Sequence, residues 1–166
     1  MQLDNPKLLT LEQALEWREQ LSARGLKLVM TNGCFDLLHT GHLFFLKQAK
    51  DNGDRLLIAL NGDVSVQMLK GPTRPVQSEQ ERAYLLAELT CVDALLVFNT
   101  PRLATEIQAL RPDVYVKAGD YNPASLNPLE RTALEAVAAE IQFLPFLPGY
   151  STTHLIEKIA NAAHAF

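Results

Sequence analysis

This sequence has few cysteines, no excess of positive charge and no long apolar runs. The two cysteines, Cys34 and Cys91, lie far apart without the paired spacing of a zinc site, which indicates a reduced protein that we expect to be cytoplasmic. The net charge of -4 argues against a nucleic-acid interface, because such interfaces need clustered positive charge. No run of about twenty apolar residues occurs and the N-terminus does not resemble an export signal, so we expect no membrane association.

The rest of the composition is that of an ordinary folded domain. The 166 residues are 48% hydrophobic and 20% charged, without low-complexity tracts. A chain of this length can bury roughly two-thirds of its unfolded surface around one core, so we expect a single domain over residues 1–166. Because the net charge is negative, an anionic ligand has to be held by local groups.

Short apolar runs alternate with helical periodicities along most of the chain. The runs "KLVMTN", "RLLIAL", "ALLVF", "VYVKA" and "IQFLP" predict five strands, and helices are expected over residues 41–52, 79–90, 102–110, 127–139 and 152–163. Continuous apolar strands separated by helices are typical of an α/β fold, a doubly wound parallel sheet with helices on both faces.

Two of the predicted helices carry clear start signals. Thr10 and Gln13 form a capping box before an amphipathic stretch that Gly25 ends, which predicts an additional helix near the N-terminus. Asn127 is a predicted N-cap, and Glu130 is placed to complete a second capping box.

Polar stretches follow four of the predicted strands, at residues 31–42, 61–77, 117–121 and 148–153. The second of these shows no periodicity and is predicted to be a long loop, a feature that is often functional in a compact domain. Ligands of open parallel sheets bind beyond the carboxyl ends of the strands. We therefore expect the four stretches to meet at one edge of the sheet.

The stretch "TNGCFDLLHTGH" has the composition of a phosphate site. Gly33 lets the backbone leave the strand sharply, and Gly41 removes a side chain where a helix begins, so that a phosphate can approach the first helical amides. His39 and His42, three positions apart, can donate hydrogen bonds to one phosphate that gains charge in a transition state. This arrangement predicts phosphoryl transfer without a covalent intermediate.

Other interpretations of these residues remain open. The two histidines could be half of a metal site, although the sequence supplies no obvious further ligands, or they could simply cap the helix. Cys34 could be a nucleophile, but it has no activating partner at a diagnostic spacing. We therefore expect Cys34 to line the site through its backbone.

A second anion site is predicted at Ser151, Thr152 and Thr153, which offer hydroxyls and free amides at a helix start. An ordinary N-cap is an equally good interpretation of these three residues. Lys70 lies on a segment with Gly and Pro from which it could reach a polyphosphate, whereas Arg74 could do the same or be solvated.

The helix dipole does not favour a cation such as Arg82 near a helix start, so this residue is expected to meet an anionic ligand or a carboxylate partner. Asn61 and Asp63 end the second strand and could hold a ribose, a magnesium-bound water or merely a turn.

The block "CFDLLHTGH" resembles the nucleotidyltransferase superfamily whose signature is His, any residue, Gly, His. The blocks "TNGCFDLLHTGHLFFLKQAKDNGDRLLIALNGD", "LKGPTRP", "RPDVYVKAGDY" and "LPGYSTTHLIEKI" are similar, in the same order, to the heptose 1-phosphate adenylyltransferases. Nearly the whole chain is covered. A four-residue signature alone is weak, whereas four ordered blocks are specific.

The resemblance implies a Rossmann-like fold with a helical extension over residues 1–25 and a catalytic core over residues 26–166. It implies magnesium-dependent attack by a sugar 1-phosphate, D-glycero-β-D-manno-heptose 1-phosphate in the nearest members, on the α-phosphate of ATP, with release of pyrophosphate. It also implies a homodimer.

The resemblance further assigns roles to individual residues. His39 and His42 would stabilise the transition state, and Lys70 and Arg82 would bind phosphates. The residues expected to bind the nucleotide are Asn32, Gly33, Cys34, Phe35, Asp36, Gly41, Asn61, Asp63, Lys117, Gly119, Asp120, Ser151, Thr152 and Thr153.

Two positions depart from the family pattern, and both touch the expected pocket. Ala118 stands where the heptose enzymes usually have Gly, and Pro148 where an acidic residue is common. These departures bear on the identity of the sugar more than on the reaction.

Two rival functions are a cytidylyltransferase acting on glycerol 3-phosphate or another phospho-alcohol, and a nucleotide-binding sensor without turnover. The cytidylyltransferases usually carry a basic residue shortly before the Ser-Thr-Thr segment, where this chain has "FLPFLPGY", which favours ATP over CTP. The presence of both histidines, Lys70 and Arg82 argues against the sensor. The short acidic chain makes a tRNA synthetase fragment remote.

Overall fold

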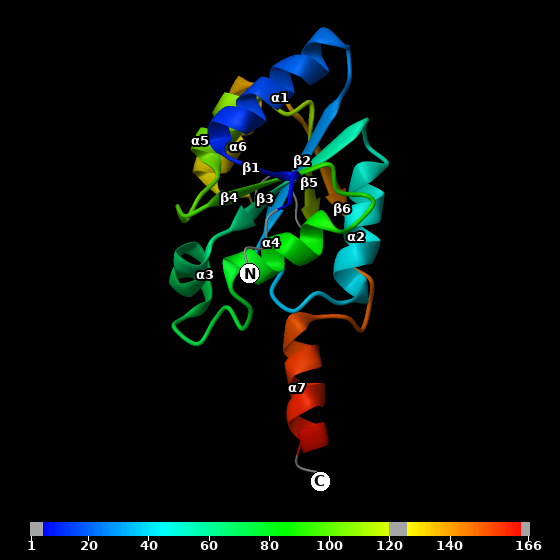
Figure 1. The fold of residues 1–166 in the computed structure, drawn as a ribbon, viewed down its shortest axis with the longest axis vertical. Helices are drawn as coiled ribbons and strands as arrows, with labels where there is room; N and C mark the ends of the chain where they lie inside the picture. The colour runs from blue at the N-terminus through cyan, green and yellow to red at the C-terminus, as the bar shows by residue number, and fades with distance from the viewer. Residues whose placement is uncertain (1–4, 120–125, 164–166) are drawn as a thin grey trace.

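The computed structural model describes residues 5–119 and 126–163. Its strands are β1 (Leu8–Leu9), β2 (Leu28–Gly33), β3 (Arg55–Asn61), β4 (Ala94–Phe98), β5 (Val114–Ala118) and β6 (Glu140–Leu144). Its helices are α1 (Leu11–Ala23), α2 (Thr40–Lys50), α3 (Asp63–Lys70), α4 (Glu79–Ala87), α5 (Ala104–Leu110), α6 (Pro128–Ala136) and α7 (Thr152–Ala163). The strands form one parallel sheet in the order β1-β4-β3-β2-β5-β6 (Figure 1).

Two apolar clusters cover the two faces of the sheet. Leu57 and Ala59 of β3 belong to the first cluster, together with buried residues of α1, α5 and α6. Ile58 and Leu60 belong to the second, together with buried residues of α2 and α4. Because successive side chains of a strand point to opposite faces, this division confirms the predicted parallel sheet with helices on both sides.

The order of strands reverses between β2 and β5. The chain runs from β2 to β3 and β4 on one side, then returns to add β5 and β6 on the other side of β2. In open parallel sheets a ligand binds beyond the carboxyl ends of the strands at such a switch point. The segment after β2, the predicted phosphate site, begins at this point.

The sequence prediction is wrong in three details. Within residues 5–119 and 126–163 the sheet has six strands and not five. The edge strand β1 was not predicted, because it pairs only two residues with β4 and is too short to show a periodicity. The predicted loop at residues 61–77 contains α3. Glu130 turns inward and accepts a hydrogen bond from the Leu103 backbone N–H at 3.2 Å, in place of the predicted capping box.

The other start signals are confirmed. Thr10 and Gln13 form the capping box of α1, and the Asn127 side chain accepts from the Leu129 N–H at the start of α6. Ala14 and Leu21 join α1 to the first cluster, so this helix packs on the sheet.

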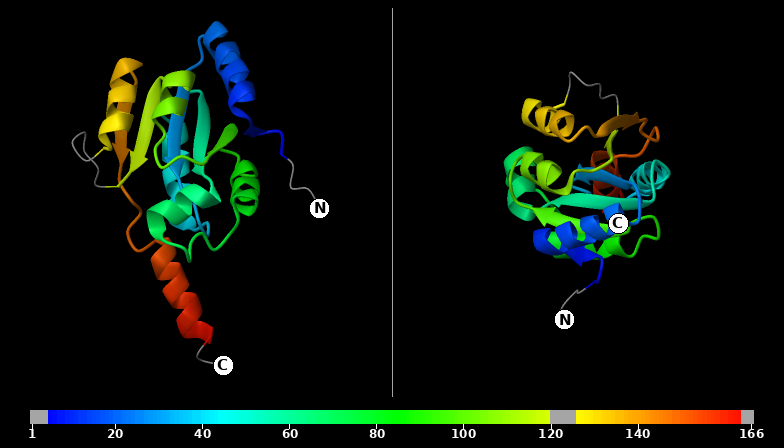
Figure 2. Two further views of the ribbon diagram at one scale, coloured as in Figure 1. Left: turned by 90° about the vertical axis from the view of Figure 1, so that its left-hand side faces the viewer. Right: turned by 90° about the horizontal axis from the view of Figure 1, so that it is seen from above.

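Helix α7 differs from the other helices because it runs away from the sheet (Figure 2). It carries no buried residue, although Ile159 is apolar and 56% exposed. Within residues 5–119 and 126–163, no helix is both long enough and apolar enough to cross a bilayer.

Candidate active site

The segment from Cys34 to His42, here called the histidine corner, follows β2 in an unusual backbone conformation. Phe35 and Leu37 have φ angles of 46° and 52°, a region that residues with side chains occupy at a cost. A Cβ atom on Gly33 would lie 2.9 Å from the Phe35 ring, so this position requires glycine. The Phe35 ring meets the His42 ring edge-on, with centroids 5.2 Å apart. The strained corner therefore supports one of the two predicted imidazoles.

The imidazoles of His39 and His42 stack on each other, with centroids 3.8 Å apart and planes inclined by 20°. Both Nδ1 atoms are buried, and neither has a hydrogen-bond partner among the described residues. Burial lowers the pKa of His39, and burial together with the charges of His39 and Lys70 lowers the pKa of His42 to about 4. Near neutral pH both rings are therefore uncharged, and each buried Nδ1 is left without a protein partner among the described residues.

The turn before α7 lies against the start of α2. A Cβ on Gly41 would come within 3.0 Å of the Tyr150 Cβ and 3.1 Å of the His39 ring. The Thr152 hydroxyl donates to the backbone carbonyl of Asp36 at 2.9 Å, and Ser151 caps α7 by accepting from the His154 N–H at 3.1 Å. Thr153 is exposed. Two helix N-termini, which both attract anions, therefore begin side by side.

The carboxylate of Asp36 points into the protein. It is almost completely buried and accepts from the backbone N–H groups of Val76 (3.0 Å) and Gln77 (3.1 Å). It also forms an ion pair with Arg74 Nε at 2.8 Å. These bonds fasten the histidine corner to residues 71–78, here called the brace segment. They engage both carboxylate oxygens of Asp36, so this side chain is not free to bind a nucleotide.

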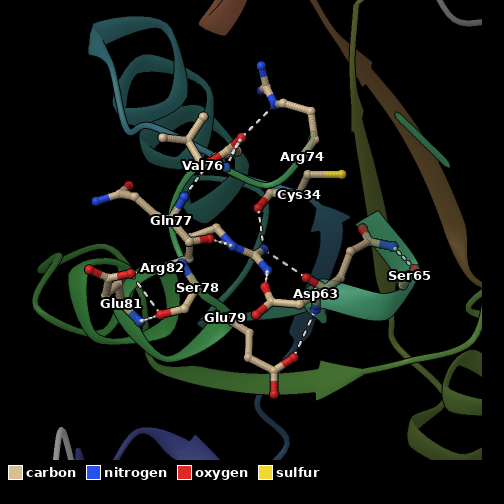
Figure 3. A network of polar contacts seen from close by, with 12 residues as sticks. Cys34, Asp63, Ser65, Arg74, Val76, Gln77, Ser78, Glu79, Glu81 and Arg82 are labelled. Carbon is tan, nitrogen blue, oxygen red and sulfur yellow. Dashed lines mark hydrogen bonds and ion pairs between the residues drawn. The ribbon is translucent and has the colours of Figure 1, made fainter. Parts of the chain in front are cut away.

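Arg82 lies behind the same corner, with its side chain at 0% exposure (Figure 3). Its guanidinium donates to the backbone carbonyls of Gln77 (3.0 Å), Cys34 (2.7 Å) and Asn61 (2.7 Å) and to the Asp63 carboxylate (2.7 Å). The prediction offered an anionic ligand or a carboxylate partner for this residue, and the structure supplies the carboxylate.

Lys70 is an exposed cation whose charge acts on the His42 imidazole. It ends α3, and its charge lowers the pKa values of both Cys34 and His42. The pKa of the Cys34 thiol is nevertheless raised, because burial outweighs the cations around it. A protonated thiol is a poor nucleophile, which agrees with the backbone role expected for Cys34.

The other predicted residues of this edge lie in different surroundings. The Asn32 amide oxygen accepts from Lys117 Nζ and, at 2.8 Å, from the Tyr115 hydroxyl, and burial lowers the pKa of Lys117. Asn61 is buried and donates to Ser65 at 2.9 Å.

Two predicted residues lie at the end of β5 and beyond it. A Cβ on Gly119 would collide with the Phe146 ring, so glycine is needed there. Asp120 lies outside the described residues.

Sequence reasoning missed two supporting residues of the site. Glu79 accepts from the Asp63 N–H at 2.9 Å, and Tyr150 abuts Gly41. Neither residue stands at a diagnostic spacing from its partner, so no local signal identified it. Arg74, left open between phosphate binding and solvation, is instead paired with Asp36.

No group of three or more His, Cys, Asp or Glu side chains converges as a metal site within the described residues. Asp36 is committed to the brace segment and Asp63 to Arg82. These residues therefore do not fit a metal cage built by the protein alone.

Comparison with known proteins places this geometry in a family. A family model described as Cytidylyltransferase-like matches residues 30–158. The bifunctional protein HldE of Helicobacter pylori (strain ATCC 700392 / 26695) is 46% identical over 160 residues, 96% of this chain and 32% of that protein. HldE of Syntrophotalea carbinolica is 45% identical over 138 residues, 83% of this chain and 28% of that protein. The chain thus spans about a third of the length of these relatives.

Solved structures agree on the fold. A lipopolysaccharide core biosynthesis protein from Thermoplasma volcanium superposes with a TM-score of 0.60 at 25% identity, covering 74% of this chain and 98% of that one. A pantoate-beta-alanine ligase from Francisella tularensis, complexed with beta-gamma ATP and beta-alanine, gives a TM-score of 0.58 at 16% identity over 96% of this chain and 78% of that one. The family model and the relatives named HldE confirm the resemblance to nucleotidyltransferases, and the chain belongs to the cytidylyltransferase-like family.

Proposed function

We propose that this chain transfers AMP from ATP to a sugar 1-phosphate, most specifically D-glycero-β-D-manno-heptose 1-phosphate, and releases pyrophosphate. The observation that carries the proposal is the stacked pair of neutral imidazoles at the start of α2, with unpartnered Nδ1 atoms, beside the helix start at Ser151. Family membership and the relatives named HldE support the reaction class. The four sequence blocks that resemble the heptose 1-phosphate adenylyltransferases support the sugar.

In the proposed reaction an oxygen of the sugar phosphate attacks the α-phosphorus of ATP, and the bond from that phosphorus to the β-phosphate oxygen breaks. The negative charge on the α-phosphate oxygens grows as both groups are partly bonded. His39 and His42 would donate hydrogen bonds to those oxygens. Lys70 would neutralise the departing pyrophosphate, and the amides at the start of α7 would hold its oxygens.

Magnesium is proposed to enter with the nucleotide. Magnesium in such sites keeps several waters and is held by substrate phosphates with few protein carboxylates. When bound it would neutralise phosphate charge. The protein's own contribution is to orient the phosphates at the two helix starts.

The preference for ATP over CTP rests on the segment before Ser151, which lacks the basic residue usual in the cytidylyltransferases. Ala118, at the end of β5, departs from the pattern of the heptose enzymes, so the sugar requires a direct test.

A cytoplasmic homodimer is proposed in addition. No residue of α7 is buried in the described chain, and a twelve-residue helix is only marginally stable alone in water. A second copy of this chain would bury residues such as Ile159. Nucleotides and reduced cysteines both agree with the cytoplasm.

Pyrophosphate release, measured with ATP or CTP against a panel of sugar 1-phosphates and glycerol 3-phosphate, tests the proposal. We expect turnover with ATP and heptose 1-phosphate. A strong preference for CTP and a phospho-alcohol would replace it with the cytidylyltransferase alternative. Nucleotide binding without turnover on any acceptor would favour the sensor.

A further inference from the structure

Arg82 offers no surface to a phosphate, because no part of its side chain is exposed. Three backbone carbonyls and one carboxylate accept from its guanidinium, at 2.7 to 3.0 Å. A phosphate could reach the group only after these bonds had broken. Since each of them is made to a buried or half-buried partner, breaking them would leave polar groups without compensation.

The charge of Arg82 is also neutralised within the protein. Its Nη2 atom lies 2.7 Å from the Asp63 carboxylate, so the pair presents little net positive potential to an anion. Lys70 differs on both counts, because it is exposed and has no ion pair among the described residues. The phosphate role expected for both cations therefore suits Lys70 alone.

The four acceptors of Arg82 belong to four different segments of the site. The Cys34 carbonyl opens the histidine corner, and the Asn61 carbonyl ends β3. Asp63 begins α3, the helix that carries Lys70, and the Gln77 carbonyl lies at the end of the brace segment. One planar guanidinium thus fixes the relative positions of all four segments.

Asp36 closes this network through Gln77, which is bonded to both Asp36 and Arg82. Its carboxylate accepts from the Gln77 N–H, while the Gln77 carbonyl accepts from Arg82, which in turn donates to the Cys34 carbonyl. The histidine corner and the brace segment are therefore joined in a closed ring of hydrogen bonds. Because the corner includes the left-handed residues Phe35 and Leu37, such bonds are what hold its strained backbone in place.

We propose that Arg82 is a positioning residue that sets the imidazoles through the backbone of Cys34 and Asn61, and that it does not contact the nucleotide phosphates. The inference rests on the proposed function only where kcat is measured. The measurements of pyrophosphate binding and of thermal unfolding need no acceptor sugar.

The test compares Arg82→Lys, Arg82→Met and Asp63→Asn with Lys70→Met as the matched cation control. Lysine keeps the positive charge but cannot reproduce the planar set of guanidinium donors. A positioning role therefore predicts that Arg82→Lys, like Arg82→Met, does not retain the turnover of the parent protein. We expect both Arg82 variants to lower kcat by about tenfold or more, since small displacements of catalytic groups are costly. Their dissociation constants for inorganic pyrophosphate, measured by calorimetry, should stay within about threefold of the parent.

Lys70→Met should behave in the opposite way, with weaker pyrophosphate binding and an unchanged melting temperature. Asp63→Asn should resemble Arg82→Met in a milder form, and adding it to Arg82→Met should cost little more, because both changes break the same pair. If Arg82→Met does not fold, Arg82→Lys and Asp63→Asn carry the comparison.

Pyrophosphate binding that weakens by about tenfold or more in Arg82→Met, and is restored in Arg82→Lys, would overturn the inference and make Arg82 a phosphate ligand. Additive effects of Asp63→Asn and Arg82→Met on the melting temperature would also overturn it. Failure of every acceptor sugar in the parent protein would reject the proposed function, yet would leave these binding and unfolding results to decide the role of Arg82.

Discussion

Two segments bring groups to the histidine corner, and they are anchored differently. The brace segment is fastened through buried charged side chains, with Asp36 holding two of its amides and Arg82 holding the Gln77 carbonyl. The segment from Gly149 into α7 is joined to the corner, within the described residues, by one side-chain hydrogen bond, from Thr152 to the Asp36 carbonyl. None of the residues of α7 is buried.

This difference suggests different roles for the two segments: the brace segment preorganises the histidine corner, and the segment from Gly149 into α7 contacts the ligand. The brace segment is held by bonds to the buried Asp36 and Arg82, so its position is set before a nucleotide arrives, as transition-state stabilisation by fixed donors requires. The segment from Gly149 into α7 is joined to the corner by a neutral hydrogen bond worth about 1 kcal/mol, and Thr153 at the start of the helix stays exposed. Substitutions in the two segments should therefore have different effects.

Replacing an imidazole should have the largest effect. We expect His42→Ala to lower kcat by about two or more powers of ten, because it removes one donor to the transition state. The thermal transition should remain cooperative and nucleotide binding should persist, as measured by calorimetry. His154→Ala is the matched control, since His154 lies half-exposed on α7 and should leave turnover unchanged. Normal turnover in His42→Ala would remove this residue from the mechanism.

Removing the Asp36 carboxylate, which holds the brace segment, should have the next largest effect, and this effect is on stability. Asp36→Ala leaves two backbone N–H groups and Arg74 without their acceptor, so we expect a loss of about 3 kcal/mol in the free energy of unfolding, measured with urea. Asp51→Ala, an exposed change, should cost less than about 0.5 kcal/mol. Equal values for the two variants would show that the brace does not depend on Asp36.

Acidification should destabilise the corner through His42. The pKa of His42 is about 4 in the folded chain and near its ordinary 6.5 when unfolded, so between these values the unfolded state binds more protons. Stability therefore rises with pH across this window and is lost as pH falls from about 6.5 towards 4, by on the order of 2 kcal/mol. The free energy of unfolding of His42→Gln should depend less steeply on pH, and parallel curves would contradict this assignment.

A smaller effect is expected from a substitution in the segment from Gly149 into α7. Thr152→Val removes one neutral hydrogen bond to the Asp36 carbonyl and should lower the free energy of unfolding by about 1 kcal/mol. Because the turn would then be less well placed, KM for ATP should rise while kcat changes little. Thr152→Ser, which keeps the hydroxyl, should restore KM, and a rise in KM that persists in Thr152→Ser would exclude the hydroxyl as its cause.

The same contrast explains which features the sequence could predict. The capping box of Thr10, the parallel sheet and the three-residue spacing of His39 and His42 are local patterns, and the structure contains all of them. Strand β1 was missed because two residues carry no period.

The bonds of the brace were missed because they are not local. Arg82 meets Cys34 across 48 positions of the chain, and Asp36 meets Gln77 across 41. The family resemblance assigned both residues to the nucleotide site, and a resemblance of sequence does not indicate that their side chains turn inwards to bonds within the protein. Only the tertiary fold decides the direction.

The smallest effect on the isolated chain should come from the outer face of α7. Ile159→Glu places a charge on a side chain that is already 56% exposed, so the free energy of unfolding should change by less than about 0.5 kcal/mol. The same charge would be costly inside an interface, so a dimer that uses this face should dissociate, as measured by analytical ultracentrifugation. Lys158→Gln, on the polar side, is the control. A dimer that survives Ile159→Glu must use another surface, and the apolar side of α7 would then remain uncovered in the assembly as it is in the single chain.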